Sequence, residues 1–319
     1  MKYNEMEKLL CFNEYQSKVF MPNEIFSDLQ KKIDNPSHIA FSYSYIYFIT
    51  WLYRYGKYGE INELIDQKFI KKVLGYNENY KKLDYLIKKN GILEQMNYIL
   101  TTKNFPIAYK YDEIDGLEFD YIDEYKEFSN CLNIPKNYKI KFPVKAFYRY
   151  PDNEEMQKEY DDGYVDGTFF YVDNTHLIPF EVFLFCMTNN NLSCTGFYLY
   201  AFLSYKTQIF DGYTVSIEKL IEYTGIPERT LYRYLDALKK HNMIQCYFDK
   251  EFIAGLPKEE RRANTYYVNE EHLFSDTVRP YKKRGFKTLK QYEWDKLLEE
   301  EMQEQVQQQM EFLPQKNEN

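Results

Sequence analysis

The stretch TGIPERTLYRYLDAL, residues 224–238, decides how the second half of this 319-residue chain is expected to fold. Gly225 supplies a tight turn with a positive φ angle, and Pro227 starts a helix where its missing N–H group costs nothing. The helix has an inward face, made of Leu231, Tyr234, Leu235 and Leu238 at helical spacing. Its outward face, near the N-terminal end, carries Arg229, Thr230, Tyr232 and Arg233.

The residues around this helix predict its neighbours. Ser193 is expected to cap a long upstream helix, and Ser216 is expected to cap a short helix over residues 217–223, after a β-like stretch at 213–215. A strand over 244–248 is expected to pair with one over 265–268. The loop between these strands carries three cations, which are Lys258, Arg261 and Arg262.

This succession resembles the winged helix-turn-helix superfamily. The resemblance is carried by Ser216-x-x-x-Leu220, by residues 224–233, by Leu235-x-x-Leu238 and by residues 263–268. It covers roughly a quarter of the chain well. It implies that the exposed end of the helix enters a major groove while the basic hairpin contacts the backbone or the adjacent minor groove. Winged helices also serve protein contacts, so the resemblance is more specific for fold than for DNA binding.

The chain contains two similar units in the same order. Residues 21–26 follow the pattern M-P-x-E-I-F, and residues 178–183 follow I-P-x-E-V-F, at an offset of 157. Both units end on L-D-x-L-x-x-x-N-x-I, at residues 83–92 and 235–244, at an offset of 152. Each opening motif precedes an aromatic-rich helix, expected over about 40–54 and about 195–206.

The doubled layout, with the aromatic stretch 169–183, resembles initiator-type replication proteins of plasmids and phages in low-GC Gram-positive bacteria. We therefore expect an α+β protein with two winged helix-turn-helix domains in tandem, an acidic β/loop linker and a C-terminal helix. The expected boundaries are 1–110 for the N-terminal domain, 111–163 for the linker and hairpin, and 164–275 for the C-terminal DNA-binding domain. Residues 276–319 are expected to form a basic segment, an amphipathic helix and a disordered tail.

Charge is distributed unevenly along the chain, which has a net charge of −8. Residues 200–290 hold 16 Lys/Arg against 12 Asp/Glu, whereas residues 111–130 and 151–174 each hold eight acids against one lysine. Between these acidic stretches, residues 138–150 alternate like a strand. A local basic region within an acidic chain is compatible with a site-specific DNA binder and disfavours a protein that merely coats nucleic acid.

Further candidate DNA contacts lie outside the central helix. The basic run at 279–284, which includes Lys282, Lys283 and Arg284, is expected to add a flexible grip on the DNA backbone. In the first unit Lys81 and Lys82 are the corresponding candidates, but that segment has no arginine, so a protein-binding role fits it equally well.

The C-terminal segment 291–309 is rich in Glu and Gln and carries Trp294, Leu298, Met302 and Val306 at a spacing of four. It is expected to form a helix that contacts a partner, in a homodimer or on a protein of the replication machinery. Residues 309–313 loosely resemble the short peptide by which bacterial proteins dock on the replication sliding clamp.

Other chemistry finds little support in the sequence. There is no P-loop and no H-E-x-x-H motif, the four histidines are scattered, and Asp161 and Asp162 are adjacent on an expected loop. We expect no catalytic residue, no metal and no cofactor. The five cysteines lack a C-x-x-C pair, which favours reduced thiols in a cytoplasm. The uncharged run 35–53 suits a buried helix better than a membrane span.

The sequence thus predicts a non-enzymatic protein that binds specific sites in double-stranded DNA, with a role in replication initiation or its control on a mobile element. A transcriptional regulator is the nearest alternative. A winged-helix adaptor that binds protein instead of DNA is a second, and a metal-dependent nuclease that uses the acidic middle is a third.

Overall fold

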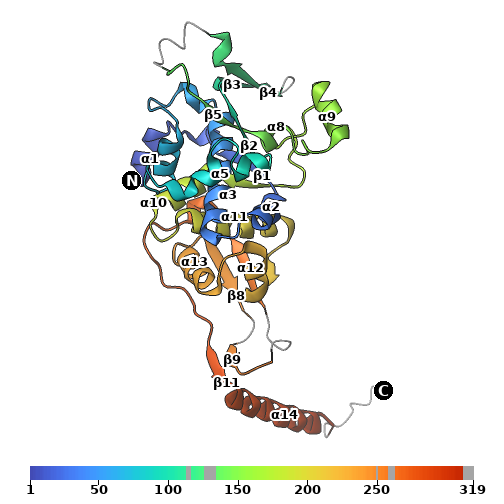
Figure 1. Ribbon diagram of the computed structural model, residues 1–319. Coiled ribbons are helices and arrows are strands. Elements are labelled where there is room, and N and C mark those ends of the chain that lie inside the picture. Colours follow the sequence, from blue (N-terminus) through green and yellow to red (C-terminus); the bar gives the residue numbers. More distant parts are fainter. Residues whose placement is uncertain (113–115, 126–133, 249–250, 258–262, 312–319) are drawn as a thin grey trace, which may run out of the picture.

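The computed structural model describes residues 1–112, 116–125, 134–248, 251–257 and 263–311. It is an α+β protein, in which helices pack around several small sheets (Figure 1). The first 161 residues form α1 (Tyr3–Leu9), β1 (Lys18–Pro22), α2 (Ile25–Lys32), α3 (Pro36–Arg54), α4 (Gln67–Val73), α5 (Asp84–Ile87), α6 (Ile92–Gln95), β2 (Ile99–Thr102), β3 (Pro106–Asp112), β4 (Gly116–Tyr121), β5 (Ile140–Pro143), α8 (Val144–Phe147) and α9 (Glu154–Asp161).

The second part of the chain repeats much of this order. It forms β6 (Thr175–Pro179), α10 (Phe180–Thr188), α11 (Ser193–Ile209), β7 (Tyr213–Val215), α12 (Ile217–Thr224), α13 (Glu228–Lys240), β8 (Ile244–Tyr247), β9 (Phe252–Ala254), β10 (Asn264–Val268), β11 (Phe286–Thr288) and α14 (Leu289–Glu311). Short 3-10 turns occur at Glu14–Gln16, Lys57–Gly59, Lys81–Leu83, Ile122–Glu124 and Glu271–Leu273.

The two similar units meet in a symmetric strand pair. β1 and β6 pair antiparallel, and Phe20 lies opposite Leu177, its own counterpart at the offset of 157. Val19 lies opposite Ile178 and Met21 opposite His176, so the pairing is unchanged when the two units are exchanged. α3 and α11 begin at residues 36 and 193, the same offset, and pack against each other. The sequence repeat is therefore matched by a pseudo-two-fold arrangement, in which β1 pairs with β6 and α3 packs against α11.

The closing motifs of the two units share a backbone conformation. Asn90 has φ +60° and lies between α5 and α6, and Asn242 has φ +54° and lies between α13 and β8. Asparagine tolerates this left-handed region better than most residues because its short polar side chain can bond locally. In both units the two leucines of the motif are buried, and they are Leu83, Leu86, Leu235 and Leu238.

One aromatic core extends across both units. Trp51 of α3 and Phe180 of α10 are fully buried and stack with ring centroids 3.7 Å apart and an interplanar angle of 5°. The Trp51 indole N–H donates to the Gln16 carbonyl at 2.8 Å. Phe48 stacks on Phe183 at 5.2 Å in the same region. The high aromatic content of the sequence thus accounts for the packing between the units.

Several local predictions need correction. Ser193 does not cap α11 through its side chain: it is the first residue of the helix and has φ +49°. The strand expected over 138–150 ends at Pro143, where residues 144–147 turn into α8. For the expected 138–150 strand, apolar periodicity over a few residues was too short to fix the backbone.

The predicted long helices are present. α3 begins four residues before the expected start, and Asn35 accepts a hydrogen bond from the Ser37 N–H at its N-terminus. From Ile39 to Tyr53 every residue of α3 is buried. In the part of the chain that the structure describes, no helix combines the length and the apolar character that a membrane span requires. Four cysteines are free thiols, of which Cys186 and Cys194 are buried as expected, while Cys131 lies outside the described residues.

His176 links the two units through a buried polar contact and makes stability depend on pH. Its Nε2 accepts from the Tyr43 hydroxyl at 2.8 Å, and its Nδ1–H donates to the Asn23 side-chain oxygen at 3.0 Å. Burial lowers the pKa of His176 from 6.5 to about 3. Below pH 6.5 the unfolded chain therefore binds a proton that the folded chain refuses, and the native state loses stability as the pH falls toward 3.

We expect this histidine to reduce the free energy of unfolding by about 1.4 kcal/mol per pH unit between pH 6 and pH 4. Urea unfolding at several pH values measures the slope. His176→Gln should be less stable at pH 7.5 but should show a shallower slope, whereas the exposed control His272→Gln should keep the wild-type slope. An equal slope in His176→Gln would contradict the assignment.

Candidate nucleic-acid interface

The segment α12–turn–α13 is organised by the residues that the sequence singled out. The Ser216 hydroxyl accepts from the Lys219 N–H at 3.2 Å and caps α12. Gly225 ends α12 with φ +68°. Pro227 is the residue before α13, and its carbonyl accepts the first helical hydrogen bond, from the Leu231 N–H at 2.8 Å. The turn at Gly225 to Pro227 fixes the direction of α13 relative to α12.

α13 has one buried face and one exposed face, as its periodicity predicted. Leu231, Tyr234, Leu235 and Leu238 are buried. Arg229, Tyr232 and Arg233 are exposed and Thr230 is half-buried. Neither arginine forms an ion pair within the described residues, although the Arg233 guanidinium lies 4.6 Å from the centre of the Tyr234 ring. The exposed face therefore offers two guanidinium groups for an external anionic partner.

Acidic residues border this face on the α12 side. Burial, together with the negative charges of Glu228 and Glu218, raises the pKa of the Tyr232 hydroxyl, so it stays protonated and can donate a hydrogen bond. Glu228 lies in the first turn of α13, where the helix dipole stabilises a carboxylate. In the first half of α13 the positive charge is thus carried by the two arginines alone.

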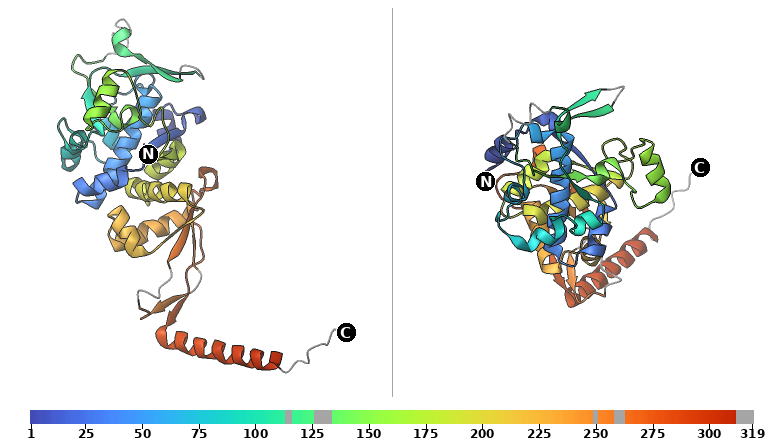
Figure 2. Two further views of the ribbon diagram at one scale, coloured as in Figure 1. Left: turned by 90° about the vertical axis from the view of Figure 1, so that its right-hand side faces the viewer. Right: turned by 45° about the horizontal axis from the view of Figure 1, so that its top comes forward.

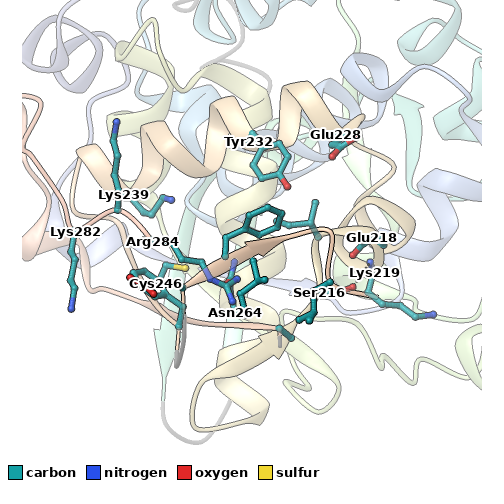
Figure 3. Close-up of a pocket in the computed structure, with 18 of the residues that line it drawn as sticks. Ser216, Glu218, Lys219, Glu228, Tyr232, Lys239, Cys246, Asn264, Lys282 and Arg284 are labelled. Carbon is teal, nitrogen blue, oxygen red and sulfur yellow. Dashed lines mark hydrogen bonds between the residues drawn. The ribbon is translucent and has the colours of Figure 1, made fainter. Parts of the chain in front are cut away.

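A groove of about 920 Å³ lies between α13 and the hairpin region (Figure 3). Tyr232 lines it from α13, Asn264 from β10, and Arg284 from the segment that follows (Figure 3). Its apolar lining comes mainly from Phe248, Phe252, Ile253 and Leu256. Of the residues that the structure describes, five cations and three carboxylates line it: Lys219, Lys239, Lys282, Lys283, Arg284, Glu218, Glu228 and Glu251.

The strands of the hairpin agree with the prediction. β8 and β10 pair antiparallel, with Thr265 opposite Tyr247 and Val268 opposite Ile244, and β7 pairs with the other edge of β10. Lys258, Arg261 and Arg262 lie outside the described residues. Beyond β8, β9 pairs in parallel with β11, an association that no sequence pattern indicated.

The basic segment, residues 279–284, is anchored and is not the free arm that the sequence suggested. The Arg279 N–H donates to the Lys240 carbonyl at 2.9 Å, and the Tyr281 hydroxyl donates to the Asp236 carboxylate at 2.5 Å. The Lys239 ammonium lies 4.4 Å from the centre of the Tyr281 ring. The segment therefore follows the C-terminal half of α13, with Lys282 and Lys283 exposed and Arg284 half-buried against Asn264.

The anchor makes Asp236 the organising carboxylate of this edge. Burial acts to raise its pKa, but hydrogen bonds from Lys240 and Tyr281 outweigh burial, and the pKa of Asp236 lies below its usual value. Burial lowers the pKa of Lys239, which also lies near Lys283. The sequence analysis did not single out Lys239, Asp236 or Tyr281. Tyr281 lies within the basic segment, and no local pattern around it indicated that it would fold back on α13.

We expect Tyr281→Phe to release the basic segment. A hydrogen bond to a charged group contributes about 1.5–3 kcal/mol, so trypsin should cleave after Lys282, Lys283 and Arg284 about tenfold faster in the variant. Mass spectrometry of the early fragments measures these rates. Tyr292→Phe, a change in α14 away from Asp236, is the matched control. Unchanged cleavage in Tyr281→Phe would show that the segment is held by other contacts.

The first unit offers a smaller counterpart of α13. Lys81 and Lys82 are exposed, but they lie in a 3-10 turn that leads into the four-residue α5. The half-buried His38 lies near them: its Nδ1 is 2.8 Å from the Tyr85 hydroxyl, and burial and then the charge of Lys82 lower its pKa. A short helix presents fewer side chains to a groove, so this surface is not equivalent to the exposed face of α13.

The residues considered for metal-dependent chemistry are Asp161 and Asp162. Asp161 is the last residue of α9 and Asp162 follows it, so these two lie at a helix end and not on an open loop. Among the residues that the structure describes, no three His, Cys, Asp or Glu side chains are grouped so that they could hold a metal ion.

Comparison of the chain with family models, with curated proteins and with solved structures finds no match.

Proposed function

We propose that this protein binds specific sites in double-stranded DNA through a winged helix-turn-helix unit formed by α11, α12, α13 and the β7–β10–β8 sheet. A second, reduced unit formed by α3, α4, α5 and the β2–β5 pair would complete the tandem arrangement. The biological role that fits this protein is replication initiation, or its control, on a plasmid, phage or other mobile element.

The observation that carries the proposal is the exposed face of α13. Arg229 and Arg233 project from the first half of a helix whose other face is fully packed. An α-helix fits the major groove of B-DNA, and arginine is the side chain that most often reads guanine there. The N-terminal end of such a helix is the part that reaches base edges in helix-turn-helix proteins. Tyr232 adds an exposed, protonated hydroxyl for a phosphate.

The charge around α13 supports the same proposal. Lys282 and Lys283 extend the positive surface on one side of the groove, while Arg284 lies within it. Contacts of such cations with phosphates release counterions and contribute affinity without sequence preference. The arginines of α13 would then supply specificity, and the anchored basic segment would supply part of the affinity.

Two other classes of function stay open as alternatives. A transcriptional regulator would use the same α13 surface and would differ only in the position of its site. A protein-binding adaptor would use the exposed aromatic residues Tyr232 and Tyr247 without DNA. The adaptor alternative gains one observation, because Glu218 and Glu228 next to Tyr232 would repel a phosphate backbone placed on that side.

The test begins with DNA recovered with the purified full-length chain. Sequencing this DNA should reveal an enriched motif, and a duplex that contains the motif should bind with an affinity that falls steeply between about 50 and 200 mM salt. A scrambled duplex of equal length is the control. Equal affinity for the two duplexes would show that the protein does not bind a specific site. The absence of affinity for either duplex at about 50 mM salt would favour the protein-binding adaptor.

A further inference from the structure

The C-terminal helix α14 exposes an apolar stripe that nothing in the chain covers within the described residues. Trp294, Leu298, Met302 and Val306 are between 43% and 64% exposed, and Leu297 beside them is 56% exposed. α14 projects from the end of the molecule opposite the β3–β4 hairpin (Figure 1, Figure 2). We propose that the stripe of one copy docks in the groove of a second copy, so that two chains exchange their C-terminal helices.

The charge of α14 identifies the kind of surface that it fits. The helix holds seven acids and two lysines over residues 289–311. Helical geometry places Glu299 on one side of the apolar stripe and Glu301 on the other. A partner that buries this stripe must therefore present apolar side chains flanked by cations.

The groove between α13 and β9 has this composition. Phe248, Phe252, Ile253 and Leu256 form its apolar lining. Among the described residues its cations outnumber its carboxylates by five to three, and the exposed Lys282 and Lys283 lie on its border. At about 920 Å³ it can accept several large side chains from one face of a helix.

A coil of two α14 helices fits the observations less well. The stripe repeats every four residues, and at 3.6 residues per turn it drifts around the helix by about 40° per step instead of forming a straight seam. The acids that flank the stripe on one helix would also face those on the other. Geometry and charge therefore both favour the groove as the site of docking.

The groove that receives α14 must belong to another copy. β11 ends at Thr288 and α14 begins at the next residue, so no linker allows the helix to fold back. The start of α14 is fixed by Thr288, whose hydroxyl accepts from the Gln291 N–H at 3.3 Å. Lys287 pairs with Asp295 of α14 at 2.8 Å and with Glu251 before β9 at 2.7 Å. When two copies exchange their helices reciprocally, the contact between α14 and the groove forms twice. Neither groove is then left open for a third copy.

One consequence rests on the proposed function. Tyr232 of α13 lines the groove, so a docked helix would cover part of the surface that we assign to DNA. DNA and the α14 of the second copy would then compete for it. The docking itself does not depend on DNA binding.

Charge exchange on the full-length chain tests the docking. Lys282→Glu with Lys283→Glu gives a groove variant, and Glu299→Lys with Glu301→Lys gives a helix variant. In each variant the groove and the helix carry like charges, so the dimer dissociation constant should rise at least about tenfold above that of the wild type. In an equimolar mixture every groove meets a helix of opposite charge, and dimers should form again with an affinity within about threefold of the wild type.

Sedimentation equilibrium at low salt gives these constants, and circular dichroism checks that each variant is folded. A wild-type chain that stays monomeric would overturn the proposal and leave α14 to a different protein. A groove variant that dimerises like the wild type would also overturn it and would indicate a coil of two α14 helices. Duplex titration of the wild-type chain alone keeps the two proposals apart: a wild type that fails to bind DNA would remove the proposed function and leave the dimerisation result unchanged.

Discussion

Replacing Arg229 and Arg233 together by alanine is expected to weaken binding to the cognate duplex by on the order of 100-fold or more, while the fold persists. Each guanidinium that reads a base contributes about 1–3 kcal/mol of discrimination, and both side chains project into solvent, so the core is not disturbed. Band shifts and fluorescence anisotropy on the cognate and scrambled duplexes measure the loss. Binding to the scrambled duplex should fall much less.

Two further variants separate charge from recognition. Arg229→Lys with Arg233→Lys keeps the charge but removes the planar fork, so affinity for the scrambled duplex should be retained while site preference is lost. Lys240→Ala is the matched control on the same helix, because Lys240 pairs with Asp236 at 2.7 Å near the C-terminal end. A double alanine variant that still prefers the cognate duplex as strongly as the wild type would show that α13 does not read the site.

Phe180→Ala is expected to lower the free energy of unfolding by about 3–5 kcal/mol, because it removes a fully buried ring and leaves a cavity beside Trp51. Phe180 belongs to the second unit and Trp51 to the first, and both lie in the single core. We therefore expect one cooperative unfolding transition for the two units, both in the wild type and in the variant.

Urea unfolding followed by Trp51 fluorescence measures this effect in a Trp294→Phe background, which removes the exposed second indole. Phe286→Ala is the control, because that ring is 65% exposed and its loss should change stability by less than about 1 kcal/mol. Two separate transitions, by fluorescence and by circular dichroism, would show that the units fold independently despite the shared core.

Local signals in the sequence were sufficient for the candidate site. The Gly225 turn, the start of α13 after Pro227, and the division of α13 into a buried and an exposed face all follow from backbone preference and helical period, which act within a few residues. The pairing of β8 with β10 was also within reach, because the two strands belong to one hairpin region. The repeated asparagines, at residues 90 and 242, share a positive φ angle, in agreement with the repeated motif.

Contacts between distant parts of the chain could not be derived in this way. Tyr281 returns to Asp236, 45 residues earlier, and converts an apparently free basic segment into one edge of the groove. Periodicity carries no information on which distant partner a side chain will meet, since that depends on the path of the intervening backbone. The prediction that the basic segment is flexible was wrong for this reason.

The sequence by itself determined the α+β class, the repeat, and which residues of α13 face outward, because these depend on propensity, period and turn chemistry. Only the tertiary structure decided that the two units join through β1 and β6, that β9 pairs with β11, and that Lys239, Arg284 and Tyr232 line one groove. These contacts arise where burial of a shared aromatic core and long-range strand pairing outweigh the entropy of closing long loops. That balance belongs to the whole chain and not to any one stretch of it.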